Sequence, residues 1–447
     1  MPTKSVIRLF ILSALTLFSG LLAASPNIET WETSNGAKVL YVHAPEIPMV
    51  DIRVVFDAGS ARDGDKPGIT SFTNTLLTEG AGDWSAQQIA ERLEGVGSQL
   101  ESGSLRDMAW VSVRSLTDPE VLDLTLETLS AILVKPRFSA DDIARERQSI
   151  LAGLIRDEQS PGSIGKKQLY QLVYGDHPYA ADPSGTKASV ESITREDIQQ
   201  THRRLYVARN GLIAIVGAVE RDLAAVLAEE VMRGLPAGEH TPPLPPVKSM
   251  EKEIVKQIPF PSTQSHLYLG QPGLKRGDKD YFSLYVGNHI LGGSGLVSLL
   301  SEEVREKRGL SYSVYSYFLP MRQLGLFQLG LQTKNEQAEE ALEVAKNTLS
   351  RYISEGPTEE ELKAAKQNIT GGFPLRIASN GKIVEYLAVI GFYELPLDYL
   401  DVFVEQIRAV TKEQIRDALQ RRVDPERLVR VQVGRFSNPL AQADGKP

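Results

Sequence analysis

The chain has 447 residues, with 49 Lys and Arg against 57 Asp and Glu, a formal net charge of −8, and no Cys. This length is enough for several globular domains, and the acidic balance without a long basic run argues against a nucleic-acid-binding protein, because phosphate recognition needs clustered cations. The lack of Cys excludes disulfides, thiolate metal sites and a lipid-attachment cysteine.

The first 24 residues have the pattern of a secretory signal peptide. Lys4 and Arg8 precede an apolar run over residues 9–22, and small residues at 23–25 follow it. The run is short for a membrane span, and polar sequence comes directly after it. We therefore expect a signal peptide over 1–24, a periplasmic mature protein and no stable membrane insertion. An uncleaved membrane anchor is the alternative.

The rest of the chain has the pattern of two similar halves. A strand predicted over 50–56 is followed by Gly-Asp-Lys at 64–66, and a strand predicted over 265–269 is followed by the same triplet at 277–279. Each triplet precedes a helical stretch and a glycine, Gly80 or Gly293, at the same separation, as a duplication would leave it. We predict an N-terminal domain over 25–235, a proline-rich extended linker over 236–250 and a C-terminal domain over 251–447.

Strands and helices alternate within each half. Helical periodicity covers 119–134 and 140–155, and Ser139 followed by acidic residues is typical of a helix start. Strand pairs that resemble hairpins favour an α+β fold over a purely parallel, doubly wound sheet. We predict two tandem halves, each a mostly antiparallel sheet with helices packed against it.

The six His residues do not form a metal motif. A zinc site built on one helix needs two imidazoles on the same face, and no two His lie three to five positions apart. A zinc site assembled from distant segments stays open at this point. The sequence also lacks a Gly-x-Ser-x-Gly elbow, a P-loop and a dinucleotide fingerprint. The His residues are His43, His177, His202, His240, His266 and His289.

Several motifs, taken in order, resemble those of the pitrilysin/insulinase family of metallopeptidases. They are AGSARD from residue 58, GITSFTNT from 68, YGDHPY from 174, NGLIAIVG from 210, LGGSG from 291 and REKRGLSYSV from 305. The resemblance spans nearly all of the predicted mature chain. It implies the LuxS/metallohydrolase-like α+β fold of that family and an activity on peptides or unfolded proteins.

The inverted zinc motif of the family is degenerate in this sequence. Active members carry H-x-x-E-H on a helix, with two zinc-binding His and a Glu that acts as the general base. The resemblance places Ser71 and Thr75 at the His positions, Asn74 at the base and Gly153 at the third ligand, with Glu158 the alternative for that ligand. Hydroxyl groups are poor zinc ligands and a carboxamide is no base, so we expect no metal and no cofactor in this chain.

The second half keeps the residues that meet substrate in the family. The resemblance assigns Arg305 to grip a peptide carbonyl and Tyr312 to stabilise the oxyanion, and both chemistries suit these side chains. The glycines Gly292 and Gly293 belong either to a substrate-binding segment or to a turn between two helices. We also expect a helix from about residue 296 to Arg305, ended by Gly309.

Two hypotheses follow from these residues. In the first, the chain is the catalytically incomplete subunit of an exported peptidase, and a homologous partner chain supplies zinc, His and base. In the second, it is a non-enzymatic peptide-binding or assembly protein on a peptidase fold, because loss of every metal residue fits both. Retention of Arg305 and Tyr312 favours the first hypothesis.

Overall fold

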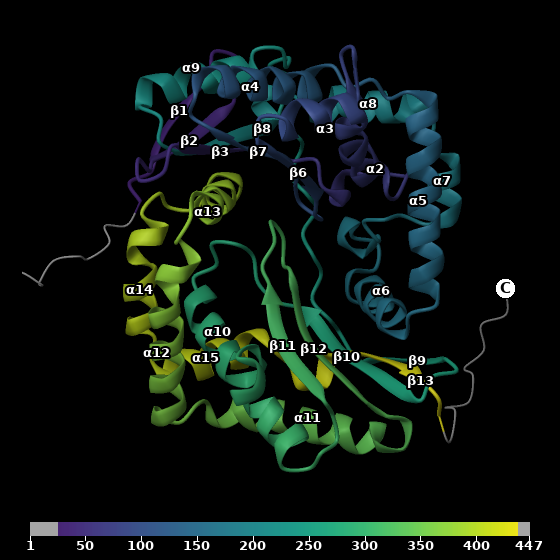
Figure 1. Cartoon of the computed structure of the whole chain (residues 1–447). Coiled ribbons are helices and arrows are strands. Elements are labelled where there is room, and N and C mark those ends of the chain that lie inside the picture. Colours follow the sequence, from purple (N-terminus) through teal and green to yellow (C-terminus); the bar gives the residue numbers. More distant parts are fainter. Residues whose placement is uncertain (1–25, 437–447) are drawn as a thin grey trace, which may run out of the picture.

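Two β-sheets, one from each half of the chain, organise the molecule (Figure 1). The computed structural model describes residues 26–436, so the predicted signal peptide and the last eleven residues, 437–447, lie outside it. The first sheet has the order β1 (Glu29–Glu32), β2 (Lys38–His43), β8 (Gly211–Gly217), β3 (Met49–Phe56), β7 (Ala109–Leu116) and β6 (Gln99–Ser104). The second has the order β11 (Ser313–Leu319), β12 (Leu326–Lys334), β10 (Gln264–Pro272), β13 (Val429–Gly434) and β9 (Ile254–Pro259).

The two sheets have the same topology. The spatial order β2, β8, β3, β7, β6 in the first half matches β9, β13, β10, β12, β11 in the second. In both sheets one pair is parallel, β2 with β8 and β9 with β13, and the other pairs are antiparallel. The predicted α+β class is confirmed, and this shared connectivity supports the duplication that the repeated triplets indicate.

Long helices cover the outer face of each sheet. Helix α4 occupies Pro119–Val134 as predicted, and α5 runs from Ala140 to Glu158, three residues past its predicted end. The hydroxyl of Ser139 accepts a hydrogen bond from the Asp142 amide, which confirms this helix start. The other main helices are α2 (Ile69–Leu76), α3 (Ala86–Glu94), α8 (Arg195–Leu205), α9 (Arg221–Met232), α10 (Tyr281–Asn288), α11 (Ala338–Glu355), α12 (Glu359–Arg376), α14 (Tyr399–Ala409) and α15 (Lys412–Arg422).

Each half lends one helix to the sheet of the other half. Helix α6 (Pro161–Tyr174) packs on β10 and β13, whereas α13 (Asn380–Phe392) packs on β3 and β8 (Figure 1). Small residues allow the close approach: a Cβ on Gly165 would lie 2.4 Å from Cε2 of Tyr268, and one on Gly391 would lie 2.5 Å from Cδ1 of Leu40. Separating the halves would therefore expose both sheets, because each sheet is covered in part by a helix of the other half.

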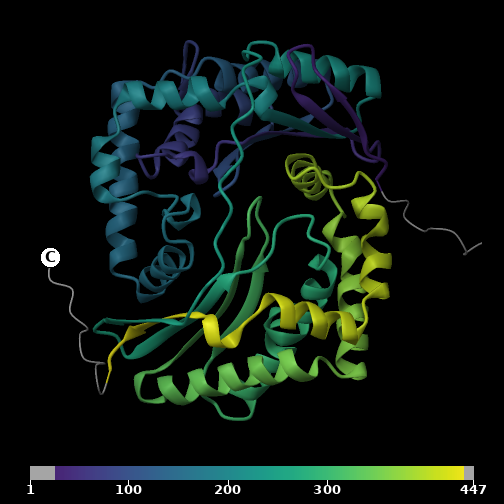
Figure 2. The same ribbon diagram turned by 180° about the vertical axis from the view of Figure 1, so that it is seen from behind.

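The connecting segment is extended and held in place. Residues 233–253 contain neither helix nor strand, and Figure 2 shows this segment running from one half to the other. The carbonyl oxygens of Pro242 and Leu244 accept hydrogen bonds from Nη1 of Arg62, at 2.7 Å, and Nε2 of Gln323, at 3.1 Å. Because these donors belong to different halves, the segment contributes to holding the halves together.

No helix within residues 26–436 has the length and apolar character needed to span a membrane.

The two Gly-Asp-Lys triplets make equivalent ion pairs. In the first half the triplet contributes its Lys, and in the second half it contributes its Asp. Nζ of Lys66 lies 2.5 Å from a carboxylate oxygen of Asp197 on α8. In the second half, a carboxylate oxygen of Asp278 lies 2.9 Å from Nη2 of Arg422 on α15. Each triplet thus ties the start of α2 or α10 to the helix that precedes the last strand of its sheet.

Asp280 is expected to make the second half sensitive to acid. Hydrogen bonds from Arg421, at 2.7 and 2.8 Å, and from Arg422 hold the pKa of Asp280 at about 2. A lowered pKa contributes stability above about pH 4 that is lost as the pH falls toward 2. We expect Asp280→Asn to lower the free energy of unfolding by about 2 kcal/mol at pH 7 and by about half of that at pH 3.

Urea unfolding followed by circular dichroism at both pH values measures this loss. Asp123→Asn is the control, because Asp123 is exposed on α4 and forms no ion pair within residues 26–436. An equal loss for Asp280→Asn at the two pH values would contradict the role of the ion pair.

Candidate functional site

Helix α2 carries three of the four degenerate zinc-motif positions. It begins after Gly68, which has a φ of +92°, and the carboxylate of Asp63 accepts hydrogen bonds from the Gly68 amide, at 2.7 Å, and the Thr70 amide, at 3.0 Å. Burial raises the pKa of Asp63 to about 6, although these hydrogen bonds favour the ionised form. Asp63 thus orders the first turn of α2 through the donors that a helix start leaves unpaired.

The Asn74 side chain bridges three elements. It is 2% exposed, its Nδ2 donates to the Gly103 carbonyl of β6 at 3.0 Å, and its Oδ1 accepts from the hydroxyl of Tyr206 at 3.1 Å. Tyr206 follows α8 directly, so the amide joins α2 to the edge of the first sheet and to α8. Both ends of the carboxamide are in use, which makes Asn74 a structural residue in this fold.

The other degenerate positions do not fit a zinc ion. The hydroxyl of Thr75 donates to the Ser71 carbonyl at 3.1 Å, within the helix. Gly153 lies on α5, which packs against α2, but offers no side chain, and Glu158 is exposed at the end of α5. Within residues 26–436, no group of three or more His, Cys, Asp or Glu side chains could hold a metal ion.

Restoring the zinc motif is expected to fail. The triple change Ser71→His, Asn74→Glu and Thr75→His would set a carboxylate against the Gly103 carbonyl, and Gly153 would still supply no third ligand. We expect no peptide hydrolysis by the triple variant. Asn74→Ala alone should lower the free energy of unfolding by about 1–3 kcal/mol, because the buried Tyr206 hydroxyl and the half-buried Gly103 carbonyl lose their partner. Ser71→Ala should stay within about 0.5 kcal/mol of wild type. Hydrolysis by the triple variant would contradict this interpretation of α2.

Arg305 and Tyr312 lie together in the second half. Arg305 is on the helical segment η7 (Ser301–Glu306), and Gly309, with a φ of +63°, ends the turn that follows. The Arg305 guanidinium carbon is 4.9 Å from the centroid of the Tyr312 ring, within the range of a cation–π contact. The helix begins at residue 299 rather than 296, because a separate 3-10 turn occupies Gly295–Val297.

The segment that carries Arg305 is anchored by Glu303. Its carboxylate accepts from Arg308, at 2.7 Å, from Lys307, at 3.0 Å, and from Arg351 on α11, at 3.2 Å. Hydrogen bonds from Arg308 and Lys307 hold the pKa of Glu303 at about 2, so it stays ionised at neutral pH. Tyr312, in contrast, is 84% exposed, and its ring is free to meet another molecule.

Gly292 and Gly293 form part of a π-helical turn, η5 (His289–Gly293), against the edge strand β11. A Cβ on Gly292 would lie 2.5 Å from the Ser316 amide nitrogen, so only glycine allows this approach. Nδ2 of Asn288 donates to the Ser316 carbonyl at 3.0 Å, which fastens the turn to the strand. Both glycines line a cavity of about 750 Å³, which leaves the predicted substrate-binding role open.

The degenerate positions lie on α2 and α5 in the first half. The Arg305–Tyr312 pair and the glycine turn lie in the second half, where η5 and η7 both contact β11. Within residues 26–436, no hydrogen bond or ion pair joins the Arg305–Tyr312 pair to α2.

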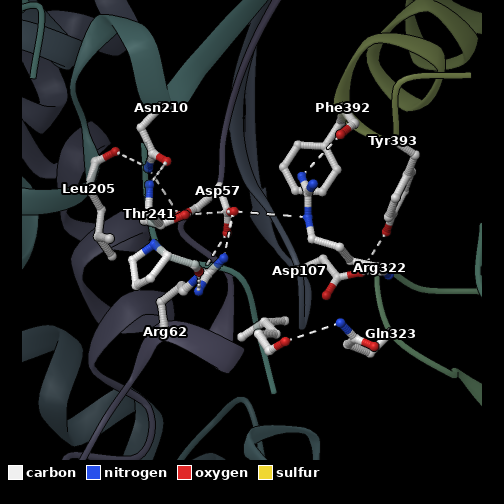
Figure 3. A network of polar contacts seen from close by, with 12 residues as sticks. Asp57, Arg62, Asp107, Leu205, Asn210, Thr241, Arg322, Gln323, Phe392 and Tyr393 are labelled. Atoms are coloured by element: carbon white, nitrogen blue, oxygen red, sulfur yellow. Dashed lines mark hydrogen bonds and ion pairs between the residues drawn. The ribbon is translucent and has the colours of Figure 1, made fainter. Parts of the chain in front are cut away.

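A buried polar node that the sequence did not predict lies between the halves, and Figure 3 shows part of it. Asp107 is 3% exposed; its Oδ1 accepts from the Tyr179 hydroxyl at 2.5 Å, and its Oδ2 accepts from the Arg322 amide at 2.7 Å and the Tyr393 hydroxyl at 2.9 Å. Asp107 is in the β6–β7 hairpin and Arg322 in the equivalent β11–β12 hairpin. No sequence spacing links these four segments, so only the topology could have revealed the node.

Comparison with known proteins agrees with this architecture. Residues 38–187 match the family model described as "Insulinase (Peptidase family M16)", and residues 192–369 match "Peptidase M16 inactive domain". This chain belongs to the M16 insulinase family of peptidases and their homologues. The predicted family resemblance is therefore confirmed.

Solved M16 structures have the same fold. An M16 inactive domain from Pseudomonas fluorescens is 38% identical, with a TM-score of 0.89, and the match covers 92% of this chain and 99% of that one. A protease from Helicobacter pylori is 18% identical, with a TM-score of 0.85, over 91% of this chain and 99% of that one, which supports the fold alone.

Relatives within the M16 family carry two kinds of name. "Uncharacterized zinc protease YmxG" of Bacillus subtilis is 25% identical over 87% of this chain and 94% of that protein. "Non-peptidase homolog YmxG" of Helicobacter pylori is 26% identical over 91% of this chain and 93% of that protein. Sequence identity at this level therefore does not distinguish relatives named as proteases from those named as non-peptidase homologues. Whether this chain can bind zinc depends on the side chains of α2.

Proposed function

We propose that this chain is the zinc-free subunit of an exported two-chain M16 peptidase. A homologous partner would supply the zinc ion, its His ligands and the general base, and this chain would supply Arg305, Tyr312 and part of the wall around the peptide. The observation that carries the proposal is the contrast between α2, whose side chains cannot hold a metal, and an Arg–Tyr pair whose Tyr is 84% exposed.

The surroundings of the pair support contact with another chain. Leu296 and Val297 are 63% and 84% exposed, and their 3-10 turn contacts the segment that carries Arg305. Large apolar side chains gathered at one surface are typical of interaction sites. An Arg fork suits a peptide carbonyl, and a Tyr hydroxyl suits a developing oxyanion, so the pair could act on a substrate held by a neighbouring zinc site.

A non-enzymatic peptide-binding or assembly role is the second candidate. It is favoured by the use of Asn74 as a structural bridge, because that bridge would serve a fold with no catalytic duty. The two candidates differ in the neighbouring gene: an adjacent exported homologue with an intact H-x-x-E-H motif would favour the two-chain peptidase.

Reconstitution tests the proposal. We expect the purified chain to retain no stoichiometric zinc by elemental analysis and to cleave no peptide by itself. Mixed with an exported homologue that carries the intact motif, it should raise peptide hydrolysis well above that of the homologue alone. One tightly held zinc per chain would contradict the proposal, and a stable complex without hydrolysis would select the assembly role instead.

A further inference from the structure

A cavity of about 750 Å³ lies beside the free edge of the second sheet, bounded by β11, α10 and the end of α12. Among the described residues, 26–436, none of those that line it is acidic. Lys166 of α6, Arg276 after β10 and Arg376 at the end of α12 all line it. The lining is therefore positively charged, although the chain as a whole has a net charge of −8.

The three cations have no carboxylate partner within residues 26–436. Nε of Arg276 donates to the Pro320 carbonyl at 3.2 Å, and Nη1 of Arg376 donates to the Tyr285 hydroxyl at 2.6 Å. Each guanidinium has five N–H donors, so both can still bind an oxyanion. Burial lowers the pKa of His289 in the same lining, and the nearby charge of Arg376 adds to this effect.

Aromatic rings form the walls between these cations. Tyr281 and Tyr285 stack with centroids 5.8 Å apart, and Tyr315 and Tyr317 stack with centroids 5.5 Å apart and planes 5° from parallel. Flat aromatic walls accept apolar parts of a ligand, whereas the cations select a negative charge. The cavity thus suits a carboxylate next to apolar side chains.

The adjoining strand favours a peptide as the carrier of that carboxylate. Within the described residues, strand β11 pairs only with β12. The η5 turn is fastened to β11 at Ser316, and an extended peptide can add to the rest of this edge through backbone hydrogen bonds. The larger cavity between the halves differs, because Glu32, Asp57 and Glu394 line it together with Arg62, Arg209 and Arg322. There Asp57 and Arg62 already pair with each other.

We propose that the β11 cavity binds a peptide carboxylate, either an acidic side chain or a free C-terminus, of an extended peptide that lies along β11. This inference deepens the proposed function by naming a substrate class, and it rests on that function only for the peptide nature of the ligand. Peptides with carboxylates near apolar residues are then the preferred ligands of this chain.

Fluorescence anisotropy with the full chain alone tests this binding. The probes are a labelled unstructured peptide with Glu residues between apolar ones, the same peptide with Gln for Glu, and a C-terminally amidated form of each. We expect the acidic peptide with a free C-terminus to bind at least about tenfold more tightly than the amidated Gln peptide at low salt. The two intermediate peptides identify which carboxylate is used.

Two variants connect the binding to the cavity. Arg376→Gln and Arg276→Gln should each lower the affinity for the acidic peptide by about tenfold. The melting temperature should fall by only a few degrees, because each variant loses hydrogen bonding to Tyr285 or Pro320 but stays folded. Arg233→Gln is the matched control, because Arg233 is exposed after α9 and does not line the cavity. Affinity unchanged in both cavity variants, equal affinity for all four peptides, or full displacement by an equal concentration of inorganic phosphate would overturn the proposal. None of these measurements uses a partner chain. A negative result here can therefore be distinguished from a failure of the two-chain peptidase proposal.

Discussion

Tyr312→Phe and Arg305→Ala are each expected to lower the turnover of the reconstituted two-chain peptidase by about 10²–10³-fold. The reason is that a preorganised donor at a developing oxyanion contributes about 3 kcal/mol, and an Arg that holds the scissile carbonyl acts on the same atoms. Tyr312→Phe removes only the hydroxyl, since the ring can still stack on the Arg305 guanidinium. Steady-state hydrolysis of a quenched peptide measures the loss.

Measuring complex formation distinguishes a chemical role of Arg305 and Tyr312 from a structural one. Both variants should form the complex with the partner as well as wild type does in analytical ultracentrifugation, because neither side chain is buried in the isolated chain. Arg305→Lys should recover only part of the activity, since an ammonium lacks the planar fork of donors. Unchanged kinetics in Tyr312→Phe would remove Tyr312 from the mechanism, and loss of the complex would assign it to the interface instead.

Asp107→Ala should produce the largest loss of stability, about 3–5 kcal/mol in the free energy of unfolding. The variant leaves the hydroxyls of Tyr179 and Tyr393 and the amide of Arg322 without their shared acceptor. Burial raises the pKa of both phenols and the nearby Asp107 carboxylate adds to this effect, so both stay protonated donors across the neutral range. Guanidinium denaturation at pH 7 gives the value.

Milder changes at the same node serve as controls. Asp107→Asn keeps one acceptor oxygen, and Tyr393→Phe removes a single donor, so each should cost about 1–2 kcal/mol. Because the node joins the two equivalent hairpins, Asp107→Ala should also broaden the unfolding transition as the halves lose cooperativity. A cost below about 1 kcal/mol for Asp107→Ala would show that the node does not hold the halves together.

Local sequence patterns predicted α4 and the start of α5 correctly, because short-range interactions form these helices. Apolar spacing over 119–134 and the capping residue Ser139 act within one or two helical turns, and the structure has α4 and the start of α5 at those positions. The repeated triplets predicted a duplication whose two sheets share one strand order. The start of the Arg305 helix was predicted three residues early, because Gly295 begins a separate 3-10 turn.

Side-chain identity alone predicted that this chain lacks the metal ligands of its family. A hydroxyl at Ser71 or Thr75 and an amide at Asn74 have the same coordination chemistry in any fold. The structural use of Asn74 required tertiary structure, because Tyr206 and Gly103 are far from it in sequence. The cations of the β11 cavity were missed for the same reason, since Lys166, Arg276 and Arg376 come from three distant segments.

The sequence by itself determined the family, the α+β class, the doubled architecture and the absence of the inverted zinc motif, because periodicity and functional-group chemistry are local properties. Only the tertiary structure decided the exchange of α6 and α13, the node at Asp107 and the acid-free cavity beside β11. Each of these three features is formed by segments that are far apart in the sequence. Which segments meet depends on how the two sheets and their helices pack to bury apolar surface, and no single stretch of residues specifies that packing.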